Sequence, residues 1–215
     1  MHPLPDATTS DARERLLAAA LDVFAEHGYA GASVRAICRR ADANGAALNY
    51  HWGSKARLWA AVAERCGDFF LATVQPVLAR GGSPAALLEG AIGALFDALV
   101  ADPRPIRVVL WATLHAEEMD YEGTARAFDP LVELTLRTVR GLQAVGLVDP
   151  EVDVEVMVPL LHGQVVYAFA DRAGHRRFYG ADLSDPAHAA RVKRALLRTV
   201  RCALGVRADD PEDRR

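Results

Sequence analysis

The stretch "SVRAICRRADANGAALNYHWGSK", residues 33–55, carries the signals of two short helices joined by a tight turn. Ser33 and Asn44 each precede a run of helix-forming residues. Both residue types cap helices by accepting a hydrogen bond from a backbone N–H of the first turn. Residues 42–43 lie between the two runs, so we expect the turn there. The stretch therefore predicts a helix-turn-helix, whose second helix enters the DNA major groove by its N-terminal residues.

Helical patterns continue on both sides of this stretch. Residues 11–27 carry apolar side chains three and four positions apart, and Gly28 follows where a helix C-cap lies. On the other side, Gly53 interrupts the pattern and Ser54 is placed to cap a longer helix that begins near Lys55. These helices would enclose the helix-turn-helix in a small domain.

The rest of the chain predicts further helices and no strand. Segments of helical length separated by short loops lie at residues 84–100, 105–119, 124–145, 152–173 and 186–204. No segment alternates apolar and polar residues over the length of a strand. The predicted fold class is therefore all-α, with about nine helices.

This pattern predicts two domains with short flexible ends. We expect an arm at residues 1–10, a DNA-binding domain at 11–67, an effector-binding and dimerisation domain at 68–207, and a tail at 208–215. The longest apolar run, residues 156–170, contains proline, histidine and glutamine and is shorter than the ~20 residues that span a membrane. It is interpreted as a buried helix that needs cover on more than one side.

Composition excludes several classes of protein. The chain has 215 residues, 51% of them hydrophobic, which argues against disorder. Its net charge is −3, so no uniform coating of nucleic acid is expected. The three cysteines lie far apart and form no CxxC pair, which indicates neither a zinc site nor a disulfide framework and favours a reducing, cytoplasmic location.

The residue types of the predicted helix-turn-helix suit contacts with DNA. An arginine at the start of the first helix can read guanine, an asparagine can bond a base edge or a phosphate, and alanine can touch a thymine methyl group. Tyrosine hydroxyl and lysine ammonium groups suit phosphate oxygens. The predicted DNA-binding residues are Ser33, Arg35, Asn44, Gly45, Ala47, Asn49, Tyr50 and Lys55.

Residues 14–62 resemble the tetracycline-repressor (TetR) family of bacterial transcriptional regulators. The shared positions are Phe24, Gly28, Tyr29, Ser33, Ile37, Ala41, Leu48, Tyr50, His51, Trp52, Ser54, Lys55 and Leu58. Three positions depart from the family pattern: Asp42 stands where glycine is usual, Asn49 where tyrosine is common, and Ala56 where glutamate is common.

The resemblance implies a dimeric repressor rather than an enzyme, without a cofactor. Such a protein would bind a palindromic DNA operator, release it when a small-molecule effector binds, and dimerise through its last two helices. Polar or amphipathic residues within otherwise apolar helices are then candidates for the effector pocket: Trp111, His115, Glu118, His162, Gln164 and Tyr167. His115 and Glu118 also have metal-ligand spacing, but no second such pair exists, so no metal is predicted.

Two other functions remain as alternatives. A helical enzyme could use buried histidine and glutamate, but the sequence contains no GxSxG, HExxH, P-loop or dinucleotide-binding pattern. A helical interaction module that does not bind DNA is the other alternative, and the small residues at 45–47 are the feature that favours it.

Overall fold

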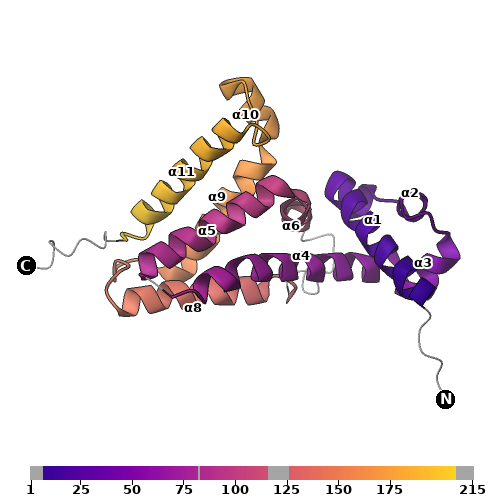
Figure 1. The fold of residues 1–215 in the computed structure, drawn as a ribbon, viewed down its shortest axis with the longest axis horizontal. Coiled ribbons are helices and arrows are strands. Elements are labelled where there is room, and N and C mark those ends of the chain that lie inside the picture. Colours follow the sequence, from indigo (N-terminus) through magenta and orange to yellow (C-terminus); the bar gives the residue numbers. More distant parts are fainter. Residues whose placement is uncertain (1–6, 82, 116–125, 207–215) are drawn as a thin grey trace, which may run out of the picture. The chain divides into compact units, whose positions relative to one another are not determined.

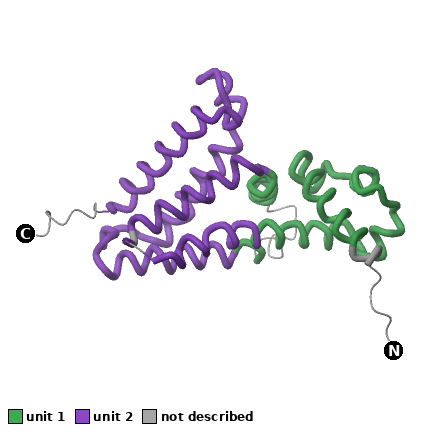
Figure 2. The backbone as a smooth tube through the Cα atoms, viewed as in Figure 1, with its two compact units in different colours: residues 1–67, 104–128 green, residues 68–103, 129–215 purple. Residues whose placement is uncertain are grey.

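A computed structural model describes residues 7–81, 83–115 and 126–206, and the described chain forms two compact units (Figure 2). Unit 1 contains residues 1–67 and 104–128, and unit 2 contains residues 68–103 and 129–215. Ten helices and no strand occur in the described ranges, which confirms the all-α prediction. Within those ranges, no helix combines the length and the apolar character needed to cross a bilayer.

Unit 1 contains the predicted helix-turn-helix (Figure 1). Its helices are α1 (Ala7–Gly31), α2 (Val34–Arg40), α3 (Gly45–Trp52), the first part of α4 (Lys55–Leu78) and α6 (Arg104–Leu114). Helices α1, α2 and α3 all contact one another. The predicted pair of short helices and the turn between them are thereby confirmed.

Side-chain caps start three of these helices, as the sequence predicts. The Ser33 hydroxyl accepts from the Ala36 N–H at 3.1 Å, and the Asn44 side-chain oxygen accepts from the Ala47 N–H at 2.9 Å. The Ser54 hydroxyl accepts a hydrogen bond of 3.1 Å at the start of α4. Each cap satisfies an N–H that has no partner within its own helix and is worth about 1 kcal/mol.

Residues with positive φ interrupt or separate the helices of unit 1, among them Gly28 and Asp42. Gly28 has φ 68° and ψ −178°, which interrupts α1 three residues before its end. Asp42, with φ 48°, forms the turn between α2 and α3. Glycine adopts this conformation without strain, whereas aspartate adopts it at some cost, so the departure from the family's glycine at position 42 is tolerated rather than favourable.

The core of unit 1 forms around the inner face of α1. The side chains of Leu16, Phe24, Ile37, Leu48 and Leu58 are almost completely buried. The ring of Phe24 also lies 5.0 Å from that of Trp59, in an edge-to-face arrangement. Because this core draws on α1, α2, α3 and α4, it fixes the orientation of the short α3 that could not form a stable helix alone.

Helix α6 belongs to unit 1, although the sequence-based boundary at residue 67 assigned it to the second domain. It packs on α1. Arg104 forms an ion pair with Asp22 at 2.8 Å, and the Trp111 indole N–H donates to the Ala25 carbonyl at 3.4 Å. The Trp111 ring also fills the space beside Gly28. Contacts between residues so far apart in sequence leave no local signal.

Unit 2 contains the rest of α4 with α5 (Pro84–Ala101), α8 (Asp129–Ala144), α9 (Val154–Ala170), α10 (Arg172–Tyr179) and α11 (Pro186–Ala203). Helix α9 contacts α8 and α11, and α11 contacts α5. The helices predicted at 84–100 and 186–204 are confirmed, and α8 begins later than the predicted residue 124.

The prediction of one helix over residues 152–173 is wrong at its C-terminal end. In the structure, α9 ends at Ala170 and a separate helix, α10, begins at Arg172. Most of α10 lies beyond residue 173, where the sequence pattern predicted a loop. The cause is Asp171, whose carboxylate accepts from the Gly174 N–H at 2.9 Å and so caps a new helix.

Candidate nucleic-acid interface and internal cavity

Helix α3 exposes one face and buries the other. Asn49 is exposed, and 79% of the Tyr50 surface is accessible to solvent. Leu48 is buried, as the sequence predicts, and so is Trp52. The exposed face therefore offers an amide and a phenol at the surface of a short helix that is held rigidly from behind.

The other predicted contact residues border this face. Arg35 and Gly45 are exposed, and Ala47 is half-buried. No atom lies within 4 Å of the position that a Cβ would take at Gly45, so this end of α3 is open to close approach. Ser33 and Asn44 are exposed as well, but their side chains cap α2 and α3.

The helix-turn-helix carries a local positive charge that the whole chain lacks. Residues 33–57 contain five lysines and arginines and a single acidic residue, Asp42. Arg40 is neutralised by Glu26 at 2.9 Å and Asp22 at 3.7 Å, so it stabilises the packing of α2 on α1. Within the described part of the chain, Arg35 and Arg39 have no such partner and remain available for phosphates or bases.

Lys55 is held within the fold. Its ammonium donates to the carbonyls of Tyr29 at 2.9 Å and Ala32 at 3.0 Å, and it lies 4.2 Å from the centre of the Tyr29 ring. These carbonyls lie at the end of α1 and just beyond it, where carbonyls lack helical partners and a cation is favourable. An ammonium has three N–H donors, so one remains for a phosphate. The sequence indicated the phosphate contact but not this structural role.

A cavity lies inside unit 2, lined by residues of α4, α5, α8, α9 and α11 and by Leu204. Its volume is about 90 Å³, and the cavity is partly open to solvent. Of the predicted effector residues, the structure places only His162 on its wall. Burial lowers the pKa of the His162 imidazole, so the ring is neutral at pH 7.

The other predicted effector residues lie elsewhere. Trp111 and His115 belong to unit 1, where Trp111 packs beside Gly28. Gln164 and Tyr167 are on α9 but do not line the cavity; Tyr167 is 67% exposed and donates to Asp171 at 3.2 Å. Glu118 lies outside the described residues. The cavity wall consists mainly of hydrocarbon side chains, so polar residues within apolar helices do not mark its position.

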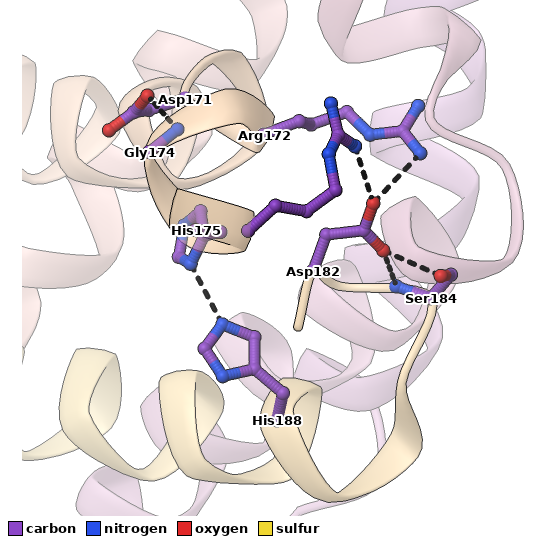
Figure 3. Close-up of polar contacts among 8 residues, drawn as sticks. Asp171, Arg172, Gly174, His175, Asp182, Ser184 and His188 are labelled. Atoms are coloured by element: carbon purple, nitrogen blue, oxygen red, sulfur yellow. Dashed lines mark hydrogen bonds and ion pairs between the residues drawn. The ribbon is translucent and has the colours of Figure 1, made fainter. Parts of the chain in front are cut away.

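A polar cluster joins α10 to α11 in unit 2 (Figure 3). The Asp182 carboxylate accepts from the backbone N–H of Ser184 at 2.9 Å and its hydroxyl at 2.5 Å, and from Arg176 at 2.8 Å and Arg172 at 3.4 Å. These bonds, those from Ser184 foremost, hold the pKa of Asp182 well below its usual range. The carboxylate thereby ties the loop after α10 to that helix.

Two histidines connect the same helices. His175 Nδ1 and His188 Nε2 are 2.8 Å apart, so one nitrogen donates and the other accepts (Figure 3). At least one ring must therefore be neutral. Burial lowers the pKa of His188, and the neighbouring charges of His175 and Arg191 lower it further, against the opposite effects of Asp185 and Asp182.

This pair predicts a loss of stability in mild acid. The unfolded chain binds a proton at His188 more readily than the folded chain, so the free energy of unfolding falls as pH drops below about 6.5. The slope contributed by one proton is at most about 1.4 kcal/mol per pH unit. We expect His188→Phe to remove this part of the pH dependence in urea unfolding between pH 7 and 5. The exposed His27 provides the control His27→Gln, and an equal slope in both variants would contradict the assignment.

Helix α9 presents apolar side chains to solvent. Val156 is 57% exposed, Leu160 58% and Tyr167 67%, and their spacing of four and seven residues places them on one side of the helix. Exposed apolar stripes of this kind mark interaction surfaces. Helix α11, which packs beside α9, exposes Arg194 and Arg198.

Comparisons with known proteins agree with this architecture. Residues 16–62 match the family described as bacterial regulatory proteins, tetR family, and residues 88–201 match the tetracyclin repressor-like C-terminal domain. The second match alone covers more than half of the chain. The fold is similar to the solved structure of a transcriptional regulator from Rhodococcus sp. Rha1. The match covers 91% of this chain and 99% of that chain, with 26% sequence identity and a TM-score of 0.69.

Two curated relatives match over part of the chain. This chain is 36% identical over 121 residues to the HTH-type transcriptional repressor SCO4008 of Streptomyces coelicolor, and the match covers 56% of this chain and 54% of that protein. It is 32% identical over 97 residues to the HTH-type transcriptional activator FasR of Mycolicibacterium smegmatis, covering 45% and 44%. The chain thus spans about half the length of the curated relatives it matches.

Proposed function

Because this chain belongs to the TetR family of bacterial regulatory proteins, we propose that it is a dimeric DNA-binding transcriptional regulator controlled by a small-molecule effector. The observation that carries the proposal is the α2–α3 surface. A rigid short helix exposes Asn49 and Tyr50 while unpaired arginines flank it, and this combination suits readout of base edges together with phosphate contacts.

Repression is the proposed direction of control. The more similar of the two curated relatives carries the name of a repressor and the other that of an activator. The proposed operator is palindromic, since a two-fold symmetric dimer presents two equal recognition helices to two half-sites.

The proposed dimer forms through α9 and α11. Association of two copies would cover Val156, Leu160 and Tyr167 on α9, which a single chain leaves in water. The two helices pack together in unit 2, so a pair from each chain would make a four-helix interface.

The effector is proposed to bind in the cavity of unit 2 and to act through α4. This helix begins at Lys55 in unit 1, and its residues Val74 and Leu78 line the cavity. A ligand that prefers one position of α4 would shift the equilibrium between conformations of the dimer. The two recognition helices would then no longer match the spacing of one DNA turn, about 34–36 Å.

Selection of genomic fragments by the purified protein at two salt concentrations tests this function. We expect a small set of fragments to be retained at both concentrations. Retention of all sequences alike, lost at the higher salt, would mean that only nonspecific phosphate attraction operates. The fold would then serve an interaction module that does not read a DNA sequence.

Lys55→Met provides a further prediction, because it removes the ammonium and keeps the aliphatic chain. We expect the free energy of unfolding to fall by about 1–3 kcal/mol, since two carbonyls lose a charged donor. The slope of log affinity against log salt should fall by about 1, the value for one phosphate contact. Urea unfolding and fluorescence anisotropy measure the two effects. Unchanged stability would contradict the structural role, and an unchanged salt slope would contradict the phosphate contact.

A further inference from the structure

The chemistry of the cavity wall restricts what can bind there. Thirteen of the sixteen side chains that line it are hydrocarbon, and among the described residues none of the lining side chains is charged. The three polar ones are Thr135, Thr138 and His162. A charged ligand group would therefore lose its hydration without gaining an ionic partner, which is strongly unfavourable.

The two threonines supply little to a ligand. The Thr135 hydroxyl donates to the Leu131 carbonyl at 2.9 Å, and the Thr138 hydroxyl donates to the Leu134 carbonyl at 2.8 Å. Both bonds run along α8, so each hydroxyl has used its single donor and offers only a lone pair.

His162 is the remaining polar group of the wall. It makes no hydrogen bond to any other described residue, and its neutral ring offers one N–H donor and one nitrogen acceptor. The arginines of α11 do not supplement it, because Arg194, Arg198 and Arg201 line a separate, open hollow of unit 2.

We propose that the cavity binds an uncharged, mainly apolar molecule with one hydrogen-bonding group, which His162 contacts. The proposal rests on the proposed function only in identifying this cavity as the effector site. A ligand whose charged group would have to lie inside the cavity is excluded, because the wall offers that group no charged partner.

A matched pair of fluorescent probes tests the ligand class. N-phenyl-1-naphthylamine is neutral, apolar and carries one N–H, whereas 8-anilinonaphthalene-1-sulfonate has the same ring system with an added anionic group. Both brighten in apolar surroundings, so equilibrium titration of the full chain measures their affinities. We expect one neutral molecule to bind per chain, with the sulfonate at least tenfold weaker. Absence of neutral binding, or equal affinity for the sulfonate in the cavity, would overturn the proposal.

Variants establish where the probes bind. Leu134→Trp fills part of the cavity and should abolish binding of the neutral probe, while His162→Phe should weaken it about threefold to tenfold through loss of one hydrogen bond. Val145→Ala is the control, since Val145 is exposed just after α8 and does not line the cavity. Circular dichroism verifies the fold of each variant. Neutral-probe binding that survives in folded Leu134→Trp, or that falls in Val145→Ala, would overturn the assignment to the cavity.

Thr138→Lys gives a second, independent readout. It places a cation in the cavity wall, and we expect the preference to reverse so that the sulfonate binds more tightly than the neutral probe. An unchanged preference in the folded variant would contradict the proposed role of charge. The regulatory function is tested separately, by release of a selected DNA fragment. If the neutral probe binds the cavity but does not release the DNA, the proposed ligand class stands and effector control through this cavity is refuted.

Discussion

Gly28→Ala is expected to lower the free energy of unfolding of unit 1 by about 3 kcal/mol, among the largest effects of any single methyl group in this protein. Gly28 has φ 68° and ψ −178°, a region that is essentially closed to other residues and costs about 1–3 kcal/mol. The added Cβ would also lie 2.7 Å from Cδ2 and 2.8 Å from Cε3 of Trp111, and such overpacking adds about 1–3 kcal/mol. Urea unfolding followed by circular dichroism measures the change.

Gly141→Ala is the matched control. Gly141 lies within α8, and nothing lies within 4 Å of the Cβ that the substitution adds. Alanine there should stabilise the helix by about 0.5–1 kcal/mol. A double-mutant cycle separates the clash from the backbone strain. Introduced into the Trp111→Ala variant, Gly28→Ala should cost only the part of the free energy that comes from backbone strain, because the ring that the new Cβ would meet is absent. A loss below about 0.5 kcal/mol in Gly28→Ala would contradict the account of how α6 packs on α1.

The second large effect is expected at the exposed face of the helix-turn-helix. Arg35→Ala and Asn49→Ala should each weaken binding to a selected DNA fragment by about 1–3 kcal/mol, roughly 5- to 150-fold, because each removes one proposed base contact. Binding to unrelated DNA should change much less, so the ratio between the two affinities falls. Fluorescence anisotropy at one fixed salt concentration measures both.

Arg40→Ala separates base reading from general charge. Arg40 lies on α2 like Arg35, but it is paired with Glu26 and Asp22, so its removal should lower stability slightly and leave the specificity ratio unchanged. If the ratio of the affinity for the selected fragment to the affinity for unrelated DNA is the same in wild type, Arg35→Ala and Asn49→Ala, these side chains do not read bases.

The local signals of the helix-turn-helix made it predictable from sequence. Ser33, Asn44 and Ser54 cap the helices that follow them, and each forms the expected bond within three residues of sequence. Leu48 is buried as its position in the helical period indicates. Such features depend on neighbours along the chain, so the sequence contains nearly all the information needed.

Features that depend on distant contacts were not predictable in this way. Helix α6 belongs to unit 1 because Trp111 fills the space left by Gly28, a relation across more than eighty residues. The ammonium of Lys55 looked free in the sequence, yet carbonyls more than twenty residues away hold it. A residue type shows which bonds a side chain can make, but packing decides which it makes.

The cavity was missed for a related reason. Its wall consists of residues such as Leu88, Ile92 and Leu134, which are indistinguishable in sequence from residues that fill a core. Sequence periodicity shows which side of a helix is buried but not whether the buried space is filled. Polar residues such as Gln164 and Tyr167 attracted the prediction instead, and only His162 lies on the cavity wall.

Footprinting of the best selected fragment tests the central claim most directly. The account predicts protection of a short palindrome whose half-sites lie about one DNA turn or a multiple of it apart, with protection weakened in Asn49→Ala at equal protein concentration. Protection of a single asymmetric half-site, or of no defined sequence, would contradict a dimer that reads its operator through two copies of α3.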